Sequence, residues 1–128
     1  MAPAPPSRAL FEHSFPEELC LSVERGTGAL PLELRGADLL GARAALGAAL
    51  SATDDPLEIE LRLAASTAEE EARALAFALL DLVEERLRGQ EISERSELCF
   101  RSTSEALLRA LVDEMRRRYV GDPPRAMR

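Results

Sequence analysis

The segment LEIELRL, residues 57–63, alternates apolar and charged side chains without a break. Successive side chains of a β-strand point to opposite faces, so this period of two predicts a strand that is apolar on one face and charged on the other. The same period recurs in residues 17–25, 30–35 and 97–101. A sheet built from such strands can bury only one of its faces, which restricts the chain to folds with helices on a single side.

Three helices are expected between and after these strands. Asp38 is a plausible N-cap for the first helix. A helix over residues 68–88 is apolar over so broad a face that we expect neighbours on more than one side, and Gly89 ends it. The last helix covers residues 105–119 and is closed by Gly121.

The elements follow in the order ββαβαβα. Gly26, Thr27 and Gly28 separate the first two strands and predict a hairpin, and right-handed crossovers would make the last three strands parallel. We therefore expect an α+β protein close to the α/β class: a two-layer open sandwich in which three helices cover one face of a four-stranded mixed sheet. Residues 1–15 are predicted to be a flexible proline-rich arm, residues 16–120 a single α/β domain, and residues 121–128 a basic tail.

The charge and hydropathy of the chain exclude several kinds of partner. A formal net charge of -7 argues against binding to nucleic acid or to an anionic membrane surface, because both require basic patches. No apolar run is long enough to cross a bilayer or to form the core of a signal peptide. A cytoplasmic protein is therefore expected.

The residues available for catalysis are few. His13 is the single histidine, and the chain has no lysine for Schiff-base chemistry. Cys20 and Cys99 are too few and too far apart for a metal motif or a disulfide framework, so we expect reduced thiols. A pair of His13 with either thiol stays open, although structural thiols are far more common. We expect no enzyme, no cofactor and no metal site.

Glutamate and arginine repeat on neighbouring strands along the charged face of the predicted sheet. Two interpretations fit this pattern: a solvated face held by cross-strand ion pairs, or a docking surface for a second copy or another protein. The lack of a catalytic set favours a small interaction or regulatory protein that acts through this face or through a helical face, with a homo-oligomer as the expected state. The interface candidates, next to Cys99, are Glu33, Arg35, Glu58, Glu60, Arg62, Glu97 and Arg101.

Hydroxyl residues precede the second and third predicted helices. Their spacing to a following glutamate matches capping boxes, Ser66 with Glu69, Thr67 with Glu70 and Ser102 with Glu105. Helix N-termini after parallel strands also attract anions, which leaves a small anionic-ligand binder or an enzyme as an alternative, with Arg35, Arg62 and Arg101 as anion clamps. The anion or phosphorylation candidates are Ser66, Thr67, Ser102, Thr103 and Ser104.

The order of elements and the serine-bearing helix start resemble the STAS domains of anti-sigma factor antagonists. The resemblance covers residues 17–119 and implies a switch protein regulated by phosphorylation of a serine at a helix N-terminus. The family's Asp-Ser-Ser-Gly type of segment falls at Ala65, Ser66, Thr67 and Ala68, where alanines replace both the Asp and the Gly.

Overall fold

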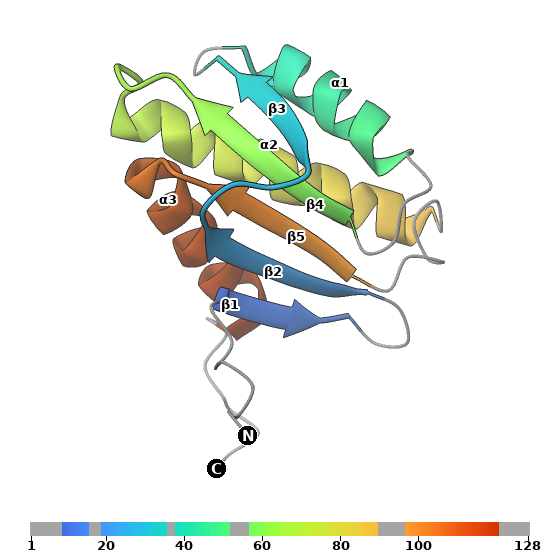
Figure 1. Ribbon diagram of the computed structural model, residues 1–128. Helices are drawn as coiled ribbons and strands as arrows, with labels where there is room; N and C mark the ends of the chain where they lie inside the picture. The colour runs from blue at the N-terminus through green and yellow to red at the C-terminus, as the bar shows by residue number, and fades with distance from the viewer. Residues whose placement is uncertain (1–8, 16–18, 36–37, 52–56, 90–96, 121–128) are drawn as a thin grey trace, which may run out of the picture.

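The computed structural model describes residues 9–15, 19–35, 38–51, 57–89 and 97–120. Within these ranges the chain forms five strands and three α-helices (Figure 1), and the last helix continues into a short π-helix, η1. In chain order the elements are β1 (Ala9–Ser14), β2 (Cys20–Arg25), β3 (Leu30–Leu34), α1 (Leu39–Leu50), β4 (Leu57–Leu63), α2 (Glu69–Arg88), β5 (Glu97–Ser102), α3 (Glu105–Met115) and η1 (Arg116–Val120).

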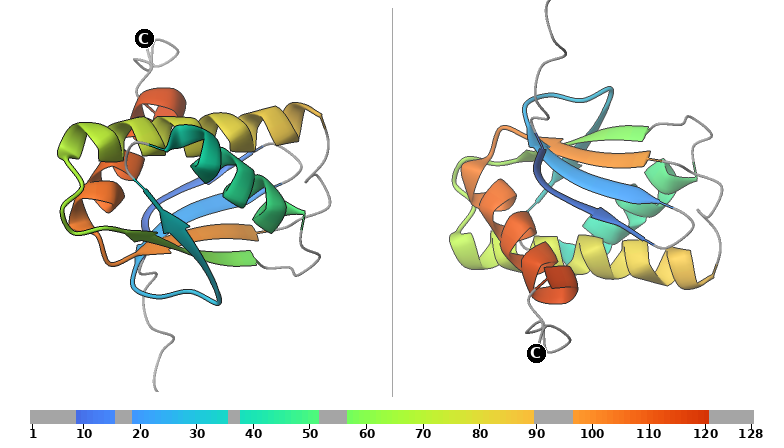
Figure 2. Two further views of the ribbon diagram at one scale, coloured as in Figure 1. Left: turned by 90° about the horizontal axis from the view of Figure 1, so that it is seen from above. Right: turned by 90° about the horizontal axis from the view of Figure 1, so that it is seen from below.

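The strands form one mixed sheet in the spatial order β1-β2-β5-β4-β3. β1 runs antiparallel to β2, and all the other neighbours are parallel. Figures 1 and 2 show the three helices on the same face of this sheet. The predicted two-layer α+β sandwich with helices on one face is therefore confirmed. We call the opposite face of the sheet the open face.

The sheet has one strand more than predicted, because β1 lies in the segment expected to be a flexible arm. Phe11 and His13 of β1 oppose Val23 and Leu21 of β2, so this edge of the sheet is anchored to the core. The prediction of a flexible arm is wrong for residues 9–14. The first eight residues, and the predicted basic tail after residue 120, lie outside the described residues.

The connection between β2 and β3 overturns the predicted hairpin. The two strands run in the same direction and are separated by β5 and β4, so they do not pair. Residues 26–29, which we call the strap, cross the open face of the sheet (Figure 1). A Cβ atom on Gly28 would lie 3.1 Å from the backbone N of Glu60 and 3.2 Å from the carbonyl carbon of Ile59, in the middle of β4.

Two glycines make this path possible. Gly26 has a φ of 130°, which residues with a side chain rarely adopt. Its N–H donates to the Ser102 carbonyl at 2.9 Å and so extends the contact between β2 and β5. Gly28 lacks the side chain that would press on β4, as glycine often does where two backbones approach closely. The glycine pair that predicted a tight turn therefore marks a backbone crossing.

The core lies between the sheet and the helix layer. α2 contacts both α1 and α3, as its broad apolar surface predicts. A large apolar side chain contributes roughly 2 kcal/mol when fully buried, so packing on one face fixes the helices there. Fully buried side chains from the strands and helices include Leu21, Val23, Leu46, Ile59, Leu61, Leu75, Leu79, Phe100, Leu107 and Leu111.

The starts of α1 and α2 confirm one predicted cap and correct another. Asp38 caps α1, since its Oδ1 accepts from a backbone N–H at 2.8 Å. α2 begins after Ala68 rather than after Ser66 or Thr67, and the Glu71 side chain accepts from the Ala68 N–H at 3.2 Å. The glutamate of a capping box is therefore present, but the N-cap residue is an alanine and has no hydroxyl to complete the box.

The start of α3 also lies two residues beyond the predicted cap. Ser104 is the N-cap, and its Oγ accepts from the Leu107 N–H at 3.3 Å. Ser102 instead ends β5 inside the protein, where its Oγ donates to the Leu61 carbonyl at 2.7 Å and accepts from the Ser104 N–H at 3.0 Å. The predicted box of Ser102 with Glu105 is therefore wrong, because Ser102 joins β5 to β4 and to the start of the helix.

An aromatic cluster fastens the end of the last helix to β1 and α2. Tyr119 stacks on His13 with ring centroids 4.1 Å apart, and Phe15 meets both rings edge-on. The Tyr119 hydroxyl donates to Glu84 of α2 at 2.8 Å. Burial lowers the pKa of His13 against the opposing effect of Glu84, and burial raises the pKa of Tyr119.

Candidate functional site

The strand register arranges the polar side chains of the open face in rows across the sheet. Each residue of a row directly opposes the next, with about 4.8 Å between neighbouring strands. One row consists of Glu12, Ser22, Cys99 and Glu58. The row beside it, on the side of the strap, contains Glu24, Arg101 and Glu60.

Arg62 lies between two carboxylates of very different exposure. Its Nε is 3.1 Å from Glu60 Oε2, and its Nη1 is 3.1 Å from Glu33 Oε2. The Glu60 side chain is only 8% exposed and also accepts from the Gly28 N–H at 3.4 Å, whereas the Glu33 side chain is 75% exposed. Hydrogen bonds to Glu60 and then Glu33 raise the pKa of Arg62. A buried carboxylate requires its counter-ion, so Arg62 is committed to Glu60.

Arg101 repeats this arrangement on the other side of the strap. Its Nη2 is 3.2 Å from Glu24 Oε1 and 3.5 Å from Glu58 Oε2. The Glu24 side chain is 21% exposed and that of Glu58 is 41% exposed. Arg101 Nε is buried, and in the described part of the chain it has no hydrogen-bond acceptor. Each arginine of the open face therefore serves one sheltered and one exposed glutamate.

Both cysteines lie on the open face as free thiols. Burial raises the pKa of the Cys99 thiol, so the thiol is protonated at neutral pH and is a poor nucleophile. His13 opposes Leu21 on the helix side of the sheet, while Cys20 opposes Ser14 on the open face. The structure therefore does not bring the histidine and Cys20 together.

The predicted interface residues divide into two patches. Arg35 follows the end of β3 and is exposed. The strap crosses β4 between Glu58 and Arg62, since Gly28 lies over the backbone of this segment. One patch contains Glu33, Glu60 and Arg62 beside the end of β3, and the other contains Glu58, Glu97 and Arg101.

Sequence reasoning missed three residues of the open face. Glu24 and Ser22 alternate with the buried Leu21 and Val23, so the same period of two could have identified them. The interface candidates came only from the other three predicted strands. Glu12 lay in the segment predicted to be a flexible arm, where adjacent apolar residues hide the period.

The hydroxyl candidates do not converge on an anion site. Ser102 is fully buried, and its hydroxyl is already bonded on both sides. Ser104 serves as the cap of α3, whereas Thr103 and Ser66 are exposed and Thr67 is half-buried. Beside the start of α3, Arg25 Nε donates to Glu105 at 2.6 Å, and this hydrogen bond lowers the pKa of Glu105. Phosphorylation of the exposed hydroxyls stays a prediction.

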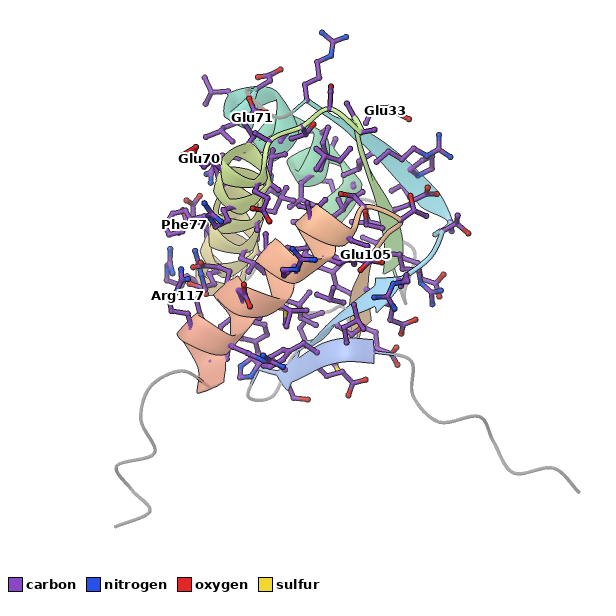
Figure 3. The ribbon with its side chains drawn as sticks, turned by 90° about the vertical axis from the view of Figure 1, so that its left-hand side faces the viewer. Glu33, Glu70, Glu71, Phe77, Glu105 and Arg117 are labelled. Carbon is purple, nitrogen blue, oxygen red and sulfur yellow. The ribbon has the colours of Figure 1, made fainter. Side chains whose placement is uncertain are left out.

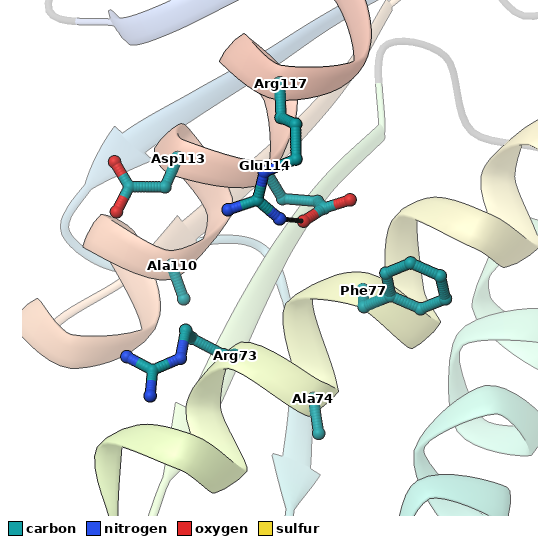
Figure 4. A pocket seen from close by; sticks show the side chains of 7 residues that line it. All are labelled: Arg73, Ala74, Phe77, Ala110, Asp113, Glu114 and Arg117. Carbon is teal, nitrogen blue, oxygen red and sulfur yellow. Dashed lines mark hydrogen bonds and ion pairs between the residues drawn. The ribbon is translucent and has the colours of Figure 1, made fainter.

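The helix side offers a shallow groove of about 240 Å³ between α2 and α3 (Figure 4). Phe77 is 54% exposed, and the Arg118 guanidinium lies 4.7 Å from its ring centroid. Arg117 Nη1 is 2.7 Å from Glu114 Oε1 within the groove. The charges of the groove nearly balance, because it is lined by Arg73, Ala74, Phe77, Ala110, Asp113, Glu114 and Arg117.

Searches of the described residues add no other type of site. They contain no group of three or more histidine, cysteine, aspartate or glutamate residues suited to hold a metal ion. Among them, no helix combines the length and the apolarity needed to cross a membrane. No protein-family model, curated protein or solved structure matches the chain.

Proposed function

We propose that the protein is a small non-enzymatic interaction protein that binds another protein through the open face of its sheet. The observation that supports this proposal is the uncovered parallel sheet. β2, β5, β4 and β3 are parallel, and parallel strands are ordinarily covered on both faces. Here the described helices cover one face and, in the part of the chain that the structure describes, only the four-residue strap crosses the other.

The open face is also preorganised for binding. Its charged side chains are held by ion pairs across β2, β5, β4 and β3, and the strap shelters part of them. Side chains that are already ordered lose little conformational entropy when a partner binds. These features favour docking on the sheet over a wholly solvated face.

The helical surfaces support an interaction site less well. Leu40 on α1 is 81% exposed, but a single exposed leucine is ordinary in a soluble domain. Phe77 is covered in part by the Arg118 guanidinium, and the groove beside it has no excess of either charge.

Site-specific photo-crosslinking in the native host tests the proposal. A benzophenone amino acid at Ser22 would project from the open face beside the central strand β5, whereas one at the exposed Ala48 of α1 serves as a matched control. We expect one adduct of defined mass from position 22, none of that mass from position 48, and its loss when Glu58→Arg is added. Adducts of the same pattern from both positions, or none from position 22, would refute docking on this face.

A further inference from the structure

We propose that the occupant of the open face is a basic segment of another protein, rich in arginine or lysine, rather than a second copy of this chain. This inference rests on the proposed function, because it names the partner of the same face. The supporting observation is that each arginine of the face forms ion pairs with two glutamates, one sheltered and one more exposed.

The two guanidiniums of the face are already committed to sheltered carboxylates. Arg62 neutralises Glu60 beneath the strap, and Arg101 neutralises the half-buried Glu24. The exposed partners of the same arginines, Glu33 and Glu58, are therefore left as net negative charge. Each cluster has two carboxylates around one guanidinium, so each presents to solvent a carboxylate whose charge the arginine of that cluster does not neutralise.

The row farther from the strap offers a place for such a cation. Ser22 and Cys99 are small, and they lie side by side between Glu12 at one end and Glu58 at the other. The span from Glu12 to Glu58 crosses three strand spacings, or about 14 Å. An extended arginine or lysine side chain could lie over the two small residues and pair with Glu58, whose side chain is 41% exposed.

The same charges disfavour the alternative occupants. Two copies packed face to face would bring exposed carboxylates of like sign together, and the whole chain has a net charge of -7. Juxtaposed like charges oppose association, and nucleic acid or an anionic membrane would be repelled in the same way. A homo-oligomer through this face, one of the expectations from the sequence, is therefore the less favoured partner.

Nuclear magnetic resonance can map a defined probe on the purified full chain. The probe is a synthetic peptide of alternating arginine and serine, and the control probe has glutamate in place of arginine. We expect amide shifts confined to the open-face residues of the five strands, and no shifts with the acidic peptide. Affinity should fall steeply as salt is added, because the attraction is between exposed charges.

Two matched variants identify the carboxylates that bind. Glu33→Gln removes an acid on the sheet side, and Glu70→Gln removes an exposed acid on α2, on the opposite side of the molecule (Figure 3). We expect Glu33→Gln and Glu58→Gln each to weaken peptide binding about two- to fivefold, the effect of one exposed ion pair, and Glu70→Gln to leave it unchanged.

The inference is overturned if the peptide shifts map to the acidic start of α2, if Glu70→Gln weakens binding as much as Glu58→Gln, or if the peptide does not bind. It is also overturned if the adduct at position 22 proves to be a dimer of this chain. In that case docking on the open face still stands, whereas the absence of any adduct removes the proposed function itself.

Discussion

Replacing Gly28 by alanine tests the strap crossing, on which the division of the open face depends. The added Cβ would lie 3.1 Å and 3.2 Å from backbone atoms of Glu60 and Ile59, closer than ordinary van der Waals contact. These atoms belong to β4, which is paired on both sides, so they cannot move away freely. Overpacking of this kind costs about 1–3 kcal/mol. Alanine also restricts the unfolded chain, which returns about 0.4–1 kcal/mol. We expect a net loss of about 1–2 kcal/mol in the free energy of unfolding.

The measurement is urea unfolding of the Gly28→Ala variant beside a Thr27→Ala control. Thr27 is exposed on the same strap, so its truncation should change the unfolding free energy by less than about 0.5 kcal/mol. In a hairpin turn Gly28 would be solvated, and alanine would be neutral or stabilising. A Gly28→Ala protein that is as stable as the parent would therefore refute the crossing over β4.

Three further variants test other parts of the structure. Arg62→Gln leaves the sheltered Glu60 without its counter-ion, so the free energy of unfolding at neutral pH should fall and the midpoint of urea titrations should drop; an unchanged midpoint would contradict the pairing. Ser102→Ala leaves the buried Leu61 carbonyl and the partly buried Ser104 N–H without their partner, and calorimetry should show a loss of about 1–3 kcal/mol; a variant as stable as the parent would contradict both hydrogen bonds. Burial lowers the pKa of His13 below its ordinary value of 6.5, so the unfolded chain binds the proton more readily and stability should decline as the pH falls below about 6.5. His13→Phe should remove that part of the decline between pH 7.5 and 5.5, and an unchanged pH profile would exclude the histidine as its cause.

Local sequence patterns predicted the layers of the fold, because each pattern shows which side of a strand or helix is buried. The alternation in residues 57–63 correctly predicted β4 and its polar face, and the breadth of apolar residues in α2 correctly predicted neighbours on two sides. The capping pattern at Asp38 was also confirmed. These signals concern a few neighbouring residues, so they do not depend on which strands pair.

Pairing and precise helix starts could not be read in the same way. The stretch Gly26 to Gly28 fits a hairpin turn and a backbone crossing equally well. The two are distinguished only by the strand order, in which β5 and β4 lie between β2 and β3. At Ser102, the demand of a buried carbonyl for a donor outweighed the capping preference of the hydroxyl. Sequence identified most charges of the open face, but it could not show that the strap shelters Glu60 and leaves Glu33 exposed.

The accessibility of the open face in the native host tests docking most directly. Carbodiimide-coupled labelling of carboxylates, read by mass spectrometry, needs no substitution and compares the purified protein with the protein in a native extract. We predict that Glu33 and Glu58 are labelled in the purified protein and protected in the extract, while Glu70 on the helix side is labelled equally in both. Equal labelling of all three carboxylates in both samples would contradict a partner on the open face.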